Sequence, residues 1–355
     1  MDGAMEKRQA RLRLLRRLSL MGVVFTTVVI LVGVWTRLVD AGLGCPDWPG
    51  CYGRLVVPDA GTASLHSPDA PLETFKAWVE MVHRYIASAL GLLVLALVAL
   101  ALPLRRLAGF PWRLTLALLV VIILQGAFGA FTVTLQLWPQ VVTLHLLGGL
   151  TVMLLFLWLY LRLRQASFED VGQPRVKRRM SPLWALVAAL LVGQLALGGW
   201  TSSNYAGIAC QGFPTCNGEW WPEMDWSDGF HLTQTVGPNY LHGQLHADAR
   251  TAIHYGHRLG ALALGVGLLL LAVAHWSRRR MRPWMLGILG SYALQVALGI
   301  ANVLLWLPLS LALVHTAGAV LLIVVLTLAY WQASLTRSHE SGNKQVDNGK
   351  EWAHA

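Results

Sequence analysis

The sequence predicts an all-α integral membrane protein, with eight transmembrane helices in two pseudo-symmetric four-helix bundles. Of the 355 residues, 55% are hydrophobic and only 13% are charged, which excludes an ordinary soluble domain. Eight apolar stretches are long enough to cross a bilayer, and a helix satisfies all of its own backbone hydrogen bonds there. We expect helices at 20–39, 78–103, 113–135, 139–163, 183–203, 251–275, 283–306 and 308–332.

An internal repeat indicates the two bundles. Residues 33–36 (Gly-Val-Trp-Thr) match 198–201 (Gly-Gly-Trp-Thr), and 124–129 (Leu-Gln-Gly-Ala-Phe-Gly) match 294–299 (Leu-Gln-Val-Ala-Leu-Gly). Because both halves have the same topology, we expect an axis along the membrane normal to relate them. The expected parts of the chain are a basic cytoplasmic N-terminus (1–19), an N-terminal four-helix unit (20–163), a basic cytoplasmic linker (164–182), a C-terminal four-helix unit (183–332) and a disordered cytoplasmic tail (333–355).

The elements follow in order from local signals. The basic N-terminus resembles the start of a signal peptide, but no small-residue cleavage site follows, so 20–39 is interpreted as an uncleaved first helix. Each half has a long outer loop after its first helix. A very short outer turn joins the third and fourth helices of each half, at 137–139 and at 307–308.

The net charge of +10 is explained by its placement. Basic residues precede the first span and fill the loops after the second, fourth and sixth spans, which all fall on one side of an eight-span topology. The positive-inside rule places these segments and both termini in the cytoplasm. The charge therefore indicates membrane orientation and does not indicate a nucleic-acid partner.

Four cysteines lie in the two long outer loops. Cys45 and Cys51 have the same spacing as Cys210 and Cys216, and the second pair follows the first by 165 residues. Disulfides persist outside the cytoplasm, so we expect Cys45–Cys51 and Cys210–Cys216 bonds. Cross-linking of each loop is the favoured role, and a thiol relay is the alternative.

Each half also carries two histidines at membrane depth, His83 with His145 and His257 with His315. Ionisable side chains at this depth are costly and usually mark function. At a rise of about 1.5 Å per residue, each histidine lies about 8–10 Å below the outer face. Two imidazoles at equal depth on different helices can bind a flat macrocycle from both faces, so four matched histidines favour two haem sites. One such histidine alone would favour a hydrogen-bonding core residue.

Charged neighbours make the two halves differ. Arg84 and Arg258 directly follow the outer histidines and can either reach the lipid headgroups or pair with haem propionates. Glu80 shares a helix face with His83, whereas its repeat counterpart is His254. The first half is therefore the expected reactive site, and the second is the expected electron-transfer or spectator haem.

Polar and small residues surround these histidines. Gln125 and Gln295 stand at matching places of the repeat and can bridge helices or line the pockets. Small residues lie one turn beyond the histidines, which leaves room for a macrocycle. These small residues are Ala87, Gly148, Gly149, Gly260, Ala261, Gly318 and Ala319.

With these residues the chain resembles the haem A synthase family, over about 20–332. The resemblance rests on Glu-x-x-His-Arg at 80–84, His-Arg at 257–258, the single histidines 145 and 315, and the outer-loop pattern over 36–49. It implies eight helices in two four-helix units, in the bacterial cytoplasmic membrane. Both termini would be cytoplasmic and the cysteine loops periplasmic.

The resemblance also implies a reaction and its sites. His257 and His315 would hold haem b, and haem O would lie near His83 and His145 as the substrate. Glu80 matches the acidic residue that the reaction needs. One methyl group of haem O would become an alcohol and then a gem-diol, which loses water to leave the formyl group of haem A, used by terminal oxidases. Expected partners are membrane lipid and a quinol or ferredoxin as electron partner; further candidates are haem O synthase and a second copy of the chain.

Two other functions share some of these features. A di-haem membrane cytochrome for quinol-linked electron transfer would use the same four histidines, but it does not explain why Glu80 occurs in one half only. A transporter would also show repeats, but clear Gly/Pro breaks in paired helices are lacking. The outer loop at 204–250 is longer than a minimal family member needs, and its His242 and His246 have a spacing that binds metal only on a helix.

Overall fold

The computed structural model describes residues 2–165, 180–237 and 239–351. In that part of the chain, eight helices are long and apolar enough to cross a membrane, which confirms the predicted all-α, multi-pass membrane protein. They are α1 (Asp2–Leu38), α3 (Thr74–Ala101), α4 (Trp112–Thr134), α5 (Pro139–Gln165), α6 (Pro182–Ser203), α8 (Ala247–His275), α9 (Arg282–Leu304) and α10 (Leu309–Glu351).

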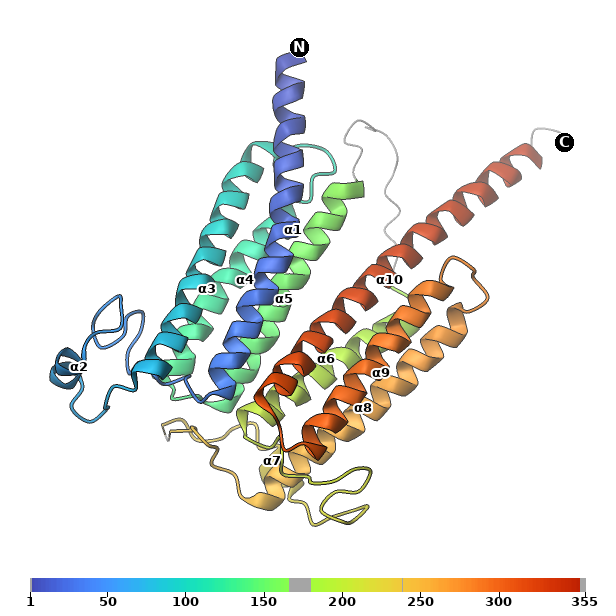
Figure 1. Cartoon of the computed structure of the whole chain (residues 1–355). Coiled ribbons are helices and arrows are strands. Elements are labelled where there is room, and N and C mark those ends of the chain that lie inside the picture. The colour runs from blue at the N-terminus through green and yellow to red at the C-terminus, as the bar shows by residue number, and fades with distance from the viewer. Residues whose placement is uncertain (1, 166–179, 238, 352–355) are drawn as a thin grey trace.

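The helices form two groups of four (Figure 1). In the first group α1 packs against α3 and α5, and α4 packs against α5; in the second, α6 packs against α8 and α9 against α10. Contacts of α5 with α6 and of α1 with α10 join the groups. The predicted axis between them stays a prediction.

Two large apolar cores hold the helices, one within the first group and one that joins the second group to Ile30 of α1 and to Leu150 and Met153 of α5. In the first, α3 contributes Leu90, Val94 and Leu97, whose spacing of three to four residues puts them on one helix face. In the second, Leu264 and Leu268 of α8 have the same role. These side chains lie about two to four turns beyond the histidines of α3 and α8, so the cores fix the helices below the expected haem sites.

The long loops that follow α1 and α6 carry two short helices that the sequence did not predict, α2 (Ala60–His66) and α7 (Trp226–Gly229). Both lie at the end of the molecule opposite the two termini (Figure 1). The carboxylate of Asp59 accepts a hydrogen bond from the Thr62 backbone N–H at 2.9 Å, which begins α2 and lowers the pKa of that carboxyl group. Asp225 begins α7 in the same way.

Two helices are longer than expected. Helix α1 begins at Asp2, within the segment expected to precede the first span, and α10 continues to Glu351 through the tail expected to be disordered (333–355). The physical reason in the tail is that no proline follows Pro308, so no residue there breaks the helical hydrogen bonding. Most of the expected linker, at 166–179, lies outside the described residues.

The C-terminal ends of α1 and α6 meet through polar side chains. The Arg37 guanidinium donates to the Ser202 carbonyl at 2.6 Å and lies 3.6 Å from the centre of the Tyr205 ring. The Tyr205 hydroxyl donates to Asp40 at 2.9 Å, and burial raises the pKa of Tyr205, which keeps this hydroxyl protonated. The hydrogen-bonded residues are 165 positions apart, so each contacts its counterpart in the repeat.

Candidate functional site

The four predicted histidines lie on four helices, two in each group. His83 of α3 and His145 of α5 are close enough to interact electrostatically, and so are His257 of α8 and His315 of α10. All four are half-buried. The structure thus brings the histidines together in the pairs expected from the repeat.

A glycine of the preceding membrane-spanning helix lies next to each imidazole ring. A Cβ atom at Gly33 would lie 2.7 Å from the Cε1 atom of His83, closer than real Cβ atoms approach. Any larger residue there would push the ring out of place. The four contacts are Gly33 with His83, Gly129 with His145, Gly198 with His257 and Gly299 with His315.

The ring nitrogens provide a test of whether haem fits these residues. The Nδ1 atoms of His83, His145 and His315 are buried and have no hydrogen-bond partner in the protein. Buried polar atoms normally have a partner, and neutral imidazole is the commonest protein ligand for metal. The paired imidazoles therefore fit the donor set that haem iron requires.

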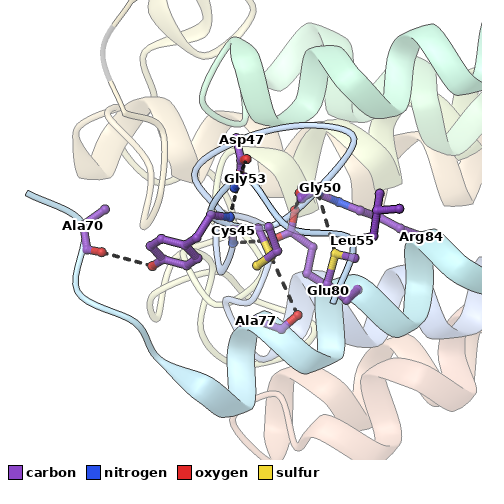
Figure 2. Close-up of a disulfide and its surroundings, with 12 residues drawn as sticks. Cys45, Asp47, Gly50, Gly53, Leu55, Ala70, Ala77, Glu80 and Arg84 are labelled. Atoms are coloured by element: carbon purple, nitrogen blue, oxygen red, sulfur yellow. Dashed lines mark hydrogen bonds and ion pairs between the residues drawn. A yellow bond between two sulfur atoms is a disulfide. The ribbon is translucent and has the colours of Figure 1, made fainter. Parts of the chain in front are cut away.

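Glu80 is buried near the N-terminal end of α3 and faces the first disulfide loop (Figure 2). One carboxylate oxygen lies 2.5 Å from the Arg84 guanidinium, and the other accepts the Cys45 backbone N–H at 2.9 Å. Arg84 also donates to the carbonyls of Pro49 and Gly50. Glu80 and Arg84 therefore fasten this loop to the helix that carries His83.

The second half repeats this arrangement without the acid. The Nδ1 atom of His254 accepts the Cys210 backbone N–H at 3.3 Å, as Glu80 accepts that of Cys45. Arg258 donates to the carbonyls of Cys210, Gly212 and Thr215 at 2.5, 2.9 and 3.0 Å. In this structure both arginines bind loop carbonyls; contact with haem propionates stays a prediction.

The structure contains both predicted disulfides, Cys45–Cys51 and Cys210–Cys216. Each joins residues whose Cα atoms are 4.8 Å apart, and no cysteine is free. Each bond closes the loop that the neighbouring arginine holds. This arrangement agrees with a cross-linking role.

Two histidines of the long outer loop do not share a site. His242 lies 3.8 Å from Asp40, whereas His246 lies 3.3 Å from Asp225 and 3.4 Å from Asp228. Among the described residues, no group of three or more histidine, cysteine, aspartate or glutamate side chains could hold a metal ion.

Sequence reasoning missed one residue at the second histidine pair, Gln194 of α6. Its amide nitrogen lies 3.2 Å from Nδ1 of His257. The matching residue of the first half is Val29, so the repeat comparison that found Gln125 and Gln295 could not find it. One signal in the sequence could have identified Gln194. All three glutamines are followed four residues later by a glycine.

Comparison with known proteins identifies the family. Residues 16–327 match the COX15-CtaA family, described as "Cytochrome oxidase assembly protein". The chain belongs to this family. It is 44% identical to "Heme A synthase" of Shewanella oneidensis over 89% of this chain and 96% of that protein. It is 30% identical to "Heme A synthase" of Symbiobacterium thermophilum over 86% and 90%, and 27% identical to that of Shouchella clausii over 92% and 98%. The resemblance drawn from the motifs is confirmed.

Proposed function

We propose that this COX15-CtaA protein is a haem A synthase, an oxidoreductase that converts haem O to haem A in the membrane. The observation that carries the proposal is 44% identity to a "Heme A synthase" over nearly the whole length of both proteins. The paired histidines and the eight spanning helices support it, since haem O is an apolar, flat substrate. A di-haem cytochrome would share the histidines but would not explain why the residue that anchors the loop is an acid in the first half only.

We assign the two haems to different halves. Haem O would lie in the N-terminal unit (20–163) near His83 and His145, and haem b would be held by His257 and His315 in the C-terminal unit (183–332). The support is that Glu80 stands beside His83 alone, while the matching place beside His257 has the imidazole of His254. Haem b, when bound, supplies a one-electron redox centre.

Glu80 is the group we assign to proton movement. In the proposed reaction each of two oxidations replaces a C–H bond of the methyl group by a C–O bond, giving an alcohol and then a gem-diol. Water would supply the oxygen, two protons would leave in each step, and two electrons would pass to an oxidised quinone or ferredoxin. The gem-diol then loses water to form the formyl group. Glu80 lies one turn from His83, and its two oxygens are oriented by Arg84 and by the Cys45 N–H. This orientation lets the carboxylate accept or return a proton at the outer end of the substrate site.

The test replaces Glu80 with alanine and, separately, with glutamine. We expect haem A to fall about a hundredfold or more, as for the loss of a general acid–base group, while the haem b spectrum remains. Haem extraction followed by chromatography and mass spectrometry measures both. The matched control is His254→Ala, which removes the other loop acceptor and should leave haem A formation within about threefold. Undiminished haem A in both Glu80 variants would contradict the assignment.

The membrane orientation is also a proposal. The basic loops after α3 and α8 lie at the same end of the molecule as the two termini (Figure 1), as the positive-inside rule requires for a cytoplasmic face. The disulfide loops lie at the opposite end, where the periplasm would keep the cysteines oxidised. A quinol or ferredoxin as the electron partner stays a prediction.

A further inference from the structure

Three of the four histidine neighbourhoods share one pattern. A glutamine stands one helical turn before the glycine that contacts the imidazole, on the same helix face. At the fourth, before Gly33 of α1, the residue is Val29. The three glutamine–glycine pairs are Gln125 with Gly129, Gln194 with Gly198, and Gln295 with Gly299.

The three glutamine side chains also lie in equivalent positions, each beside its own histidine-bearing helix. Each amide lies against a glycine three residues after the histidine, so closely that a Cβ atom added to that glycine would collide with the amide. Three residues after His83, the corresponding residue is Ile86. The pairs of amide and glycine are Gln125 with Gly148, Gln194 with Gly260, and Gln295 with Gly318.

In the C-terminal unit the amides reach the imidazoles. The Gln194 amide nitrogen lies 3.2 Å from Nδ1 of His257 and donates to the backbone carbonyl of the same residue at 3.1 Å. The Gln295 amide nitrogen lies 3.2 Å from Nε2 of His315. The amide nitrogen donates in both contacts, which restricts rotation of each imidazole ring. Loss of a group that orients a ligating imidazole typically costs about 10–100-fold in metal affinity.

His83 lacks such a neighbour. Val29 is buried in the apolar core of the first helix group, and Ile86 packs against that core. Neither side chain can donate or accept a hydrogen bond. The contact of the His83 ring with Gly33 is kept, but the two places that hold glutamine and glycine in the other neighbourhoods hold apolar side chains here. With Val29 and Ile86 in place of the glutamine and glycine of the other neighbourhoods, the helices around His83 still pack together, but the amide is missing.

We propose that Val29 and Ile86 make His83 the exchangeable haem ligand, through which substrate enters and product leaves. Gln194 and Gln295 orient the two histidines of the C-terminal unit and retain the resident haem there. Val29 and Gln194 are therefore positioning residues, and the choice between valine and glutamine decides whether a haem turns over or stays. This inference rests on the proposed assignment of haem O to the N-terminal unit.

The experiment exchanges the two pairs in the purified full-length protein. Val29→Gln/Ile86→Gly introduces the amide beside His83, and Gln194→Val/Gly260→Ile removes it beside His257. Excess apomyoglobin collects the haem released, and mass spectrometry identifies it as haem O, haem A or haem b. We expect the first variant to release haem O and haem A about tenfold more slowly, and the second to lose haem b about tenfold faster.

A matched control separates the effect of hydrogen bonding by the amide from the effect of side-chain size. Val29→Leu/Ile86→Gly offers a side chain of similar size without hydrogen-bonding groups, and should release haem as fast as the unaltered protein. Equal slowing in the leucine and glutamine variants would overturn the proposal in favour of packing. If the glycine change prevents folding, the single variant Gln194→Leu tests the same amide, and unchanged haem b release would overturn the proposal.

The outcome also distinguishes this inference from the proposed function. If the unaltered protein and Val29→Gln/Ile86→Gly release haem O and haem A at the same rate, the proposed role of Val29 is contradicted. The proposed function of the protein is not contradicted by that result. An unaltered protein that contains haem b but neither takes up nor releases haem O or haem A would contradict the proposed function itself.

Discussion

The two disulfide loops are fastened in the same way by different chemical groups. Glu80 and His254 each accept the backbone N–H of the first cysteine of their loop. Arg84 pairs with Glu80 and donates to loop carbonyls, whereas Arg258, with no acid to pair with, donates to three carbonyls. The difference teaches that a loop of this kind does not need a carboxylate for its anchor. The acid of the first half is therefore explained better by chemistry than by structure.

The largest effect on haem A formation is expected when Glu80 is replaced by the residue at the matching place of the second half, which is histidine. Glu80→His keeps an acceptor for the Cys45 N–H, so the protein should fold, but it removes the group assigned to proton movement. We expect haem A to fall about a hundredfold or more with haem b unchanged, measured by haem extraction and the reduced spectrum. The reciprocal change His254→Glu should not raise haem A formation. A Glu80→His protein of normal activity would mean that an acceptor, and not an acid, is what this position requires.

A smaller, equal effect is expected from opening either loop. Both disulfides close segments of six-residue separation, so Cys45→Ser/Cys51→Ser and Cys210→Ser/Cys216→Ser should each lower the free energy of unfolding by about 2 kcal/mol. The arginine contacts remain in both variants. Unfolding in graded denaturing detergent measures the change. A much larger loss in one variant would show that its loop depends on the disulfide more than on its arginine.

The smallest effect is expected where the two units meet. Tyr205→Phe removes the hydrogen bond to Asp40 but keeps the ring beneath Arg37, so it should lower the free energy of unfolding by about 1 kcal/mol. Thermal unfolding of the detergent-solubilised protein checks this. Tyr205→Ala is the matched comparison and should cost more, because the contact with the guanidinium is lost as well. Equal losses would assign the whole contribution to the hydroxyl.

Much of the fold was predictable from the sequence because the lipid phase imposes strict rules. Long apolar stretches gave the eight helices, and the repeat gave both the histidine pairs and the cysteine pairs. Helix ends were less predictable, since α1 and α10 extend beyond their apolar stretches. In α1 the added residues are rich in arginine, lysine, glutamate and glutamine, which favour helices although they are polar. The short helices α2 and α7 gave no periodic signal, since four to seven residues are too few for one.

The partners of the site residues were less predictable than the residues themselves. The sequence placed Arg84 and Arg258 beside the histidines but could not show that their guanidinium groups reach the carbonyls of the disulfide loops. Those carbonyl positions depend on the path of the whole loop. The sequence also could not place Gln194 against His257, because contacts between helices depend on how far each helix is rotated about its axis.

The contacts between the two units suggest why both units belong to one chain. These contacts join Arg37 to Ser202 and Asp40 to Tyr205. In a symmetric dimer of identical chains, a residue next to the two-fold axis faces a copy of itself. Arginine would then meet arginine, and aspartate would meet aspartate. Covalent joining removes that restriction, since each place can carry a different side chain in each unit. The same freedom permits an acid beside one histidine pair and an imidazole beside the other, which no homodimer could combine.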